Sequence, residues 1–117
     1  MPRAFDENEL LERVDNDWDF LAETVEMLAK DGRALMAEIR DAAASGDAAA
    51  VARVAHTLKG MISNFCSPDA HAAAMAVEQL GKRGDLAAVF PATETLEAHL
   101  NCLISDLADF VSTRTKT

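Results

Sequence analysis

Apolar residues recur at alternating steps of three and four along most of the chain, the spacing that places them on one face of an α-helix. Nowhere do apolar and polar residues alternate at a period of two, so the pattern predicts no strand. The longest series contains Trp18, Leu21, Val25, Leu28, Leu35, Ile39 and Ala42. The pattern therefore predicts an all-α protein.

Turn and capping residues divide this pattern into one short helix followed by four longer ones. Asp6 is expected to cap the short helix, which runs to about Val14 and buries Leu10, Leu11 and Val14. The stop-and-cap signals that follow are Asp15-Asn16-Asp17, Ser45-Gly46-Asp47, Ser67-Pro68 and Arg83-Gly84-Asp85. At Ser67-Pro68 the serine is the expected cap and the proline the first helical residue. Such short connections make neighbouring helices antiparallel, so the prediction is an up-down four-helix bundle with a short extra N-terminal helix.

The last three helices have apolar faces of their own, at the same three and four spacing. These faces are Val51, Val54, Ala55, Leu58, Ile62 and Phe65; then Ala70, Ala73, Ala74, Val77 and Leu80; then Val89, Leu96, Leu100, Leu103, Leu107 and Phe110. Gly32 interrupts the first long series, either as a tolerated flaw costing about 1 kcal/mol or as a close helix crossing. Pro91 should kink the last helix or delay its regular start. The polar end, 112–117, is expected to fray.

Length, charge and cysteine content narrow the class of protein. The 117 residues fit a single domain spanning 1–117, and Met1 with this length favours a free-standing protein. A net charge of -9 argues against nucleic acid and anionic membranes as partners. No apolar run approaches the roughly 20 residues of a membrane span. Cys66 and Cys102 have no metal-binding spacing and fit the reducing cytoplasm, the expected location.

The chain lacks the common enzyme motifs. It has neither of the two common phosphate-binding loops, GxxxxGK[ST] and GxGxxG. It also has no HExxH zinc motif and no paired ExxH motifs of a di-iron bundle. His71 and His99 have no obvious metal-binding partner and are interpreted as surface or core-edge residues. Four methionines are interpreted as filler of the core or its rim: Met27, Met36, Met61 and Met75. No metal site or cofactor is expected.

Residues 55–60 depart from this plain pattern. With about 100° between successive helical residues, His56 lies about 140° from the centre of the apolar face, on the outer flank. Ser63 falls at nearly the same angle, Lys59 lies between this flank and the core, and Gly60 lies on the outside. The apolar face is defined by Val51, Leu58 and Ile62. The pattern indicates an exposed imidazole, a cation one turn away and a bare patch of backbone.

Such a surface suits phosphoryl transfer. A neutral imidazole is a nucleophile near physiological pH, and an acceptor on a neighbouring helix would hold its second nitrogen in the protonated form. A nearby ammonium would offset the charge of the phosphoryl group, and a glycine would let another protein approach. The residues alone leave a second interpretation open, in which His56, Lys59 and Gly60 are ordinary surface residues.

The segment His56-Thr57-Leu58-Lys59-Gly60, followed by Ser63-Asn64, resembles the signature of histidine-containing phosphotransfer (HPt) domains. The family pattern is His-x-[Leu/Ile]-Lys-Gly, followed by small residues and often Asn. A second family stretch is similar to Val77-Glu78 and Lys82-Arg83-Gly84-Asp85. The resemblance covers about residues 6–111. After Asn64 the sequence departs from the family pattern, because relatives usually have glycine there. The connection between the two helices that carry the site is therefore expected to differ in shape.

The resemblance implies a role for each matching residue. His56 is the phosphorylated histidine, modified at Nε2; Lys59 steadies the phosphoryl group; Gly60 leaves room for the partner. Glu78 matches the position that hydrogen-bonds the histidine Nδ1, and Lys82 lies one turn on, at the same edge of its helix. The docking surface is expected to include Arg53, Thr57, Gly60, Met61, Ser63, Asn64 and Lys82.

The resemblance also implies a function. The protein would accept a phosphoryl group from the aspartate of one response-regulator receiver and pass it to another, in a phosphorelay that includes a hybrid histidine kinase. It would be a monomeric phosphoryl carrier without kinase activity of its own, and Mg²⁺ would belong to the receiver. Two alternatives remain: a non-catalytic helical adaptor, and a pseudo-HPt that docks receivers without being phosphorylated.

Overall fold

The computed structural model describes residues 3–115, with side chains as far as Thr113. The elements are α1 (Glu7–Arg13), α2 (Trp18–Ala44), α3 (Ala48–Ile62), a 3-10 turn η1 (Ser63–Phe65), α4 (Pro68–Arg83) and α5 (Leu86–Thr115). No strand occurs among the described residues, so the predicted all-α class is confirmed. None of the helices in this range is long and apolar enough to cross a membrane.

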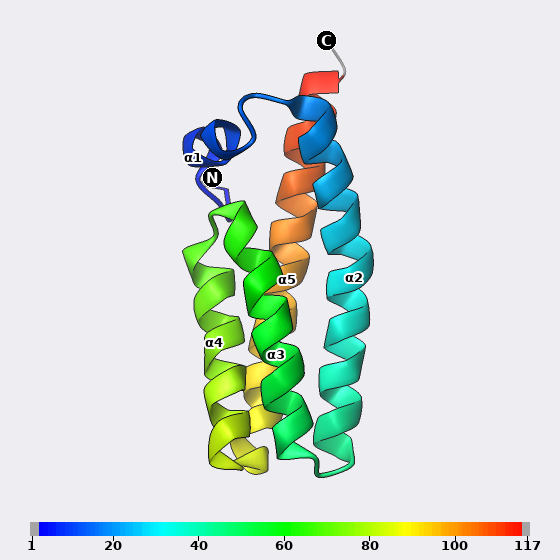
Figure 1. The fold of residues 1–117 in the computed structure, drawn as a ribbon, viewed down its shortest axis with the longest axis vertical. Coiled ribbons are helices and arrows are strands. Elements are labelled where there is room, and N and C mark those ends of the chain that lie inside the picture. Colours follow the sequence, from blue (N-terminus) through cyan, green and yellow to red (C-terminus); the bar gives the residue numbers. More distant parts are fainter. Residues whose placement is uncertain (1–2, 116–117) are drawn as a thin grey trace.

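The four long helices lie lengthwise beside one another, and their connections alternate between the two ends of the molecule (Figure 1). Each of α2 and α4 packs against both α3 and α5. The resulting body measures 48 × 22 × 21 Å. Helix α1 lies across one end, beside the connection between α3 and α4 (Figure 1).

The core lies where the four apolar faces meet. Its largest fully buried side chains are Leu10, Leu21, Leu28, Ile39, Leu58, Ile62, Leu96, Leu100, Leu103, Leu107, Val51 and Val77. Each such side chain contributes about 1.5–3 kcal/mol relative to an exposed position. From the short first helix only Leu10 is fully buried, whereas Leu11 and Val14 are half-buried against the core.

Aspartate caps begin four helices at the predicted positions. The side chains of Asp6, Asp17, Asp47 and Asp85 each accept a hydrogen bond from a backbone N–H three residues on, at 3.0–3.2 Å. The predicted serine cap is confirmed in position but not in its hydrogen bond. Ser67 occupies the N-cap position of α4, but its side chain makes no capping hydrogen bond and its hydroxyl is buried without a partner. Pro68 is the first residue of α4, as predicted.

Helix α3 ends earlier than its apolar series, because residues 63–65 tighten into η1. The turn closes at Cys66, whose φ of 56° lies in the left-handed region that favours glycine. The cysteine therefore adopts the backbone conformation that glycine would take at this point. The Cys66 carbonyl accepts a hydrogen bond from Asp6 N at 3.0 Å, and burial raises the pKa of the Cys66 thiol.

The last helix was expected to kink at Pro91 or to start late because of it, and to fray at its polar end. Helix α5 begins at Leu86, ahead of Pro91, so the proline does not delay its start, and the kink stays a prediction. The Asp85 cap fixes the first turn ahead of the proline, which then removes only one backbone hydrogen bond. Residues 112–115 continue the helix where a frayed tail was predicted, and 116–117 lie outside the described residues.

The two alternatives for Gly32 are now resolved. A Cβ at Gly32 would meet side-chain atoms of Leu28 and Leu100 at 3.5 and 3.6 Å, an ordinary contact, so this glycine is a tolerated flaw. The close helix crossing is at Gly81 in α4, where a Cβ would lie 2.7 Å from the backbone nitrogen of Ala52 in α3. Only glycine fits there without displacing backbone.

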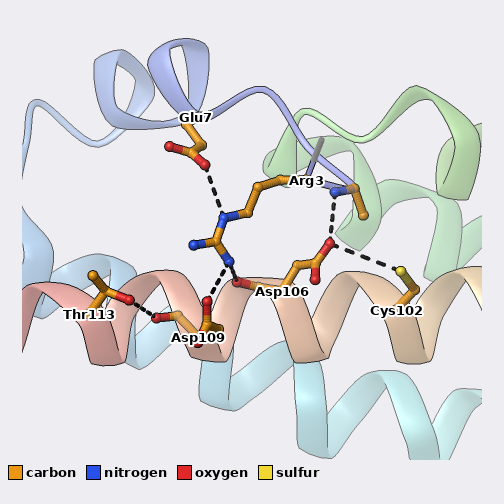
Figure 2. A network of polar contacts seen from close by, with 7 residues as sticks. Arg3, Glu7, Cys102, Asp106, Asp109 and Thr113 are labelled. Atoms are coloured by element: carbon orange, nitrogen blue, oxygen red, sulfur yellow. Dashed lines mark hydrogen bonds and ion pairs between the residues drawn. The ribbon is translucent and has the colours of Figure 1, made fainter. Parts of the chain in front are cut away.

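The segment before α1 is fixed to α5 by a polar network (Figure 2). Arg3 Nη1 contacts Asp109 Oδ2 at 2.8 Å and donates to the Asp106 carbonyl at 3.0 Å, while its Nε donates to Glu7 Oε2 at 3.0 Å. Ala4 N donates to Asp106 Oδ2 at 2.9 Å. These contacts hold the start of the chain, and with it α1, at the end of the bundle.

Candidate functional site

His56 and Glu78 face each other across the contact between α3 and α4. His56 Nδ1 lies 3.0 Å from Glu78 Oε2. The two side chains differ sharply in exposure, since the imidazole is 67% exposed and the carboxylate only 4%. The site therefore consists of a solvent-accessible imidazole held by a buried carboxylate.

Two lysines complete the cluster around Glu78. Lys59 Nζ lies 2.7 Å from Oε1, and Lys82 Nζ lies 3.1 Å from Oε2. Both contacts are ion pairs. Lys59 is mostly covered, at 21% exposed, whereas Lys82 is 65% exposed. One buried carboxylate thus contacts two ammonium groups and one imidazole.

Local helix geometry explains this convergence. His56 and Lys59 lie three residues apart on α3, and Glu78 and Lys82 lie four apart on α4, so each pair shares one flank of its helix. The crossing at Gly81 lies about one turn from the site on each helix. On α3, Ala52 precedes His56 by four residues, and on α4, Gly81 follows Glu78 by three. The close backbone approach at Gly81 brings the two flanks within hydrogen-bond distance.

The charges around Glu78 fix the tautomer of His56. The contact with Lys59 lowers the pKa of Glu78 to about 2, against the opposing effect of burial and with help from Lys82 and His56. Glu78 is therefore an anion at neutral pH and can only accept a hydrogen bond. In the neutral ring Nδ1 must then donate the proton, which leaves the lone pair on Nε2. Among the described residues, none makes a hydrogen bond or ion pair with that second nitrogen.

The rest of the predicted surface surrounds His56 on α3. Arg53, Thr57 and Gly60 are exposed, and a Cβ at Gly60 would meet nothing within 4 Å. No contact within this chain therefore requires glycine at position 60. The exposed Ser63 hydroxyl donates to the Gly60 carbonyl at 2.6 Å and closes the end of the helix.

Met61 and Asn64 line a cavity of about 470 Å³ between α1, α2 and the end of α3, and Glu78 is not among its lining residues. Its rim includes Phe20 and Met27 on α2, which are 51% and 58% exposed. Met27 is therefore not part of the core, and this partly apolar surface was missed from the sequence. The available signal was an apolar pair seven residues apart, hence on one side of α2, beside its main apolar series.

The structure thus brings together four of the predicted site residues and separates others. His56, Lys59, Glu78 and Lys82 form one cluster, while Met61 and Asn64 belong to the neighbouring cavity. His71 is half-buried beside a shallow depression near Ser67 and takes no part in the cluster. No group of three potential metal-ligating side chains occurs in residues 3–113.

Comparison with known proteins gives one match. Neither the curated proteins nor the solved structures contain a match to this chain. The family model described as Hpt domain matches residues 23–109, which is most of the chain and includes the whole cluster. The chain therefore belongs to the Hpt domain family, whose members carry out histidine phosphotransfer in two-component signalling, together with response-regulator receivers and histidine kinases.

Proposed function

We propose that His56 accepts a phosphoryl group on Nε2 from the aspartyl phosphate of one receiver domain and passes it to the aspartate of another. The observation that carries this proposal is the His56–Glu78 pair. Its Nδ1 faces a buried anion at 3.0 Å, and its ring is 67% exposed. An imidazole held in this way presents a nucleophilic nitrogen outward in a single tautomer.

The transfer follows from this tautomer. The Nε2 lone pair forms a bond to phosphorus while the bond from phosphorus to the aspartyl oxygen breaks, and the aspartate leaves as a carboxylate with the electron pair. The proton stays on Nδ1, where Glu78 stabilises the positive charge that develops on the ring. Transfer to the next receiver reverses these steps. Mg²⁺ at the receiver aspartate belongs to the partner.

Lys59 and Gly60 serve the two other requirements of the reaction. Lys59 lies one turn from His56 and carries the positive charge that offsets the arriving phosphoryl group. Gly60 leaves the approach to His56 open on the outer side of α3. The receiver docks on this exposed face and on the neighbouring cavity lined by Met61 and Asn64, a contact of modest size that suits a transient partner.

The test is incubation of the purified chain with phosphorylated receivers. Wild type should become labelled with an acid-labile, alkali-stable phosphoryl group, and His56→Gln should not. His71→Gln is the matched control and should label like wild type, because His71 lies outside the cluster. Absence of label on the wild type across a panel of receivers, or equal labelling of His56→Gln, would overturn the proposal. Receiver binding without label would identify a pseudo-Hpt domain.

A further inference from the structure

The hairpin of α3 and α4, which forms one side of the bundle, differs in charge from the rest of the chain (Figure 1). Residues 48–84 contain only two of the chain's 20 acidic residues, Asp69 and Glu78, against four of its 11 basic residues. This segment therefore carries a net charge of +2, and the remainder carries -11, within a total of -9. A strongly acidic chain thus has one side of the opposite sign.

The two acidic residues of the hairpin do not offset its exposed cations. Glu78 is buried and is already paired with Lys59 and Lys82. Asp69 lies in the first turn of α4, at the opposite end of that helix from Lys82 and Arg83. Positive charge is therefore concentrated where α4 ends and α3 begins.

Arg53 and Arg83 are exposed cations without an internal ion pair. Neither guanidinium pairs with a carboxylate anywhere in residues 3–113. Outside the hairpin, by contrast, Arg3, Arg13 and Arg40 are each paired with an acidic side chain. The two arginines of the hairpin can therefore pair with the carboxylates of another protein without breaking a contact within this chain.

Small residues leave this end of the hairpin open. A groove of about 500 Å³ lies between the start of α3 and the end of α4, and alanines and glycines line it together with Lys82 and Arg83. Ala52 belongs to this lining and precedes His56 by one helical turn. A protein surface that covers His56 can therefore extend over these cations.

We propose that the α3–α4 hairpin is an electrostatic docking face that orients acidic receiver domains, with the acidic rim of the receiver over the cations at the end of α4. The proposal rests on the phosphotransfer function proposed above and names the charge of the partner. A receiver that holds Mg²⁺ at its phosphorylated aspartate must gather oxygen ligands there, and carboxylates are the usual ones. The remainder of this chain repels such a surface, whereas the hairpin attracts it.

The test is the association rate of unphosphorylated receivers, chosen from those that label wild type, measured by stopped flow at low salt. Arg83→Glu should lower the rate constant by about threefold or more. Gln79→Lys should raise it, because it adds a cation one turn away on the same exposed side of α4. Both variants are checked for folding by circular dichroism.

Arg33→Glu is the matched control. Arg33 is an exposed arginine without an ion pair, it lines a depression between α2 and α5, and the substitution changes the net charge by the same amount. This variant should associate at a rate close to that of wild type. All differences should disappear at about 1 M salt, where the Debye length is about 3 Å.

Three outcomes would overturn the docking face. One is an equal low-salt rate for Arg83→Glu and Arg33→Glu, and another is a wild-type rate that rises with salt, because net repulsion would then dominate. The third is self-association of the chain at low salt that Arg83→Glu abolishes, which would assign the face to a second copy. Absence of label on His56 would instead contradict the proposed function, and it is observed before any rate is compared.

Discussion

At the scale of single residues, the cluster depends on a carboxylate that is buried yet charged. The side chain of Glu78 is 4% exposed, and a buried carboxylate alone would be driven toward its neutral form. Its ion pairs with Lys59 and Lys82 and its hydrogen bond with His56 reverse that tendency and lower its pKa from 4.5 to about 2. The contacts that form the cluster therefore also keep Glu78 negatively charged.

The lowered pKa predicts how stability responds to acid. Because the pKa of Glu78 is lower in the folded than in the unfolded chain, its contribution is complete above about pH 4.5 and is lost as the pH falls toward 2. Glu78→Gln removes this contribution. The difference in free energy of unfolding between wild type and Glu78→Gln should therefore shrink over this interval, as measured by urea denaturation at a series of pH values. A constant difference from pH 6 to 2 would contradict the assignment.

At the scale of secondary structure, the separation of α3 and α4 is set by one glycine. Gly81 allows the backbones to meet at a point one turn from the His56–Glu78 pair. Small residues on the facing side of α3 permit the same approach, since Ala48 and Ala52 are the residues that a side chain at position 81 would meet. The geometry of the site is therefore a consequence of helix packing.

Gly81→Ala should be destabilising although alanine is the better helix former. The added methyl would lie 2.7 Å from Ala52 N, so backbone has to move, at a cost of about 1–3 kcal/mol. Gly32→Ala is the matched control, because its methyl finds ordinary contacts and should gain up to about 1 kcal/mol. Urea denaturation measures both. If the two variants were equally stable, the close crossing at Gly81 would be refuted.

At the scale of the whole molecule, the site and the cavity lie near one another because both use α3. The Arg3 network holds helix α1 in place (Figure 2). This helix forms one wall of the cavity through Arg13 and Leu10. Arg13 Nη1 also donates to the Ser63 carbonyl at 3.3 Å, which joins α1 to the end of α3. Helix α1 thereby shapes a surface at the end of α3.

Replacement of Phe20 and Met27 by serine should weaken receiver binding without lowering stability. Both side chains are more than half exposed, so little core contact is lost, whereas apolar anchors of this kind commonly contribute more than about 1 kcal/mol each to binding. Phe90→Ser on α5 is the control, because Phe90 is equally exposed, at 51%, and does not line the cavity. Calorimetry of receiver binding is the measurement. Equal affinity of the double variant and Phe90→Ser would exclude the cavity from docking.

The sequence by itself determined the features that depend on near neighbours in the chain. The helices, the four aspartate caps and the shared flank of His56 and Lys59 follow from helical spacing and capping. At Ser67 the predicted N-cap position is confirmed but its side-chain hydrogen bond is absent, and at Pro91 the helix begins without delay. The resemblance to a family added the expectation that Glu78 hydrogen-bonds His56. Helical spacing alone is compatible with that contact but does not predict it.

Tertiary structure decided everything that depends on the distance between helices. It alone showed that Gly81 rather than Gly32 is the close crossing, that Lys82 shares an oxygen with His56, and that Phe20 and Met27 face solvent beside a cavity. A helical pattern specifies which residues share a face, but not how closely that face approaches its neighbour or which parts of it remain uncovered. In a site made of one ring, one carboxylate and two ammonium groups, those distances determine the chemistry.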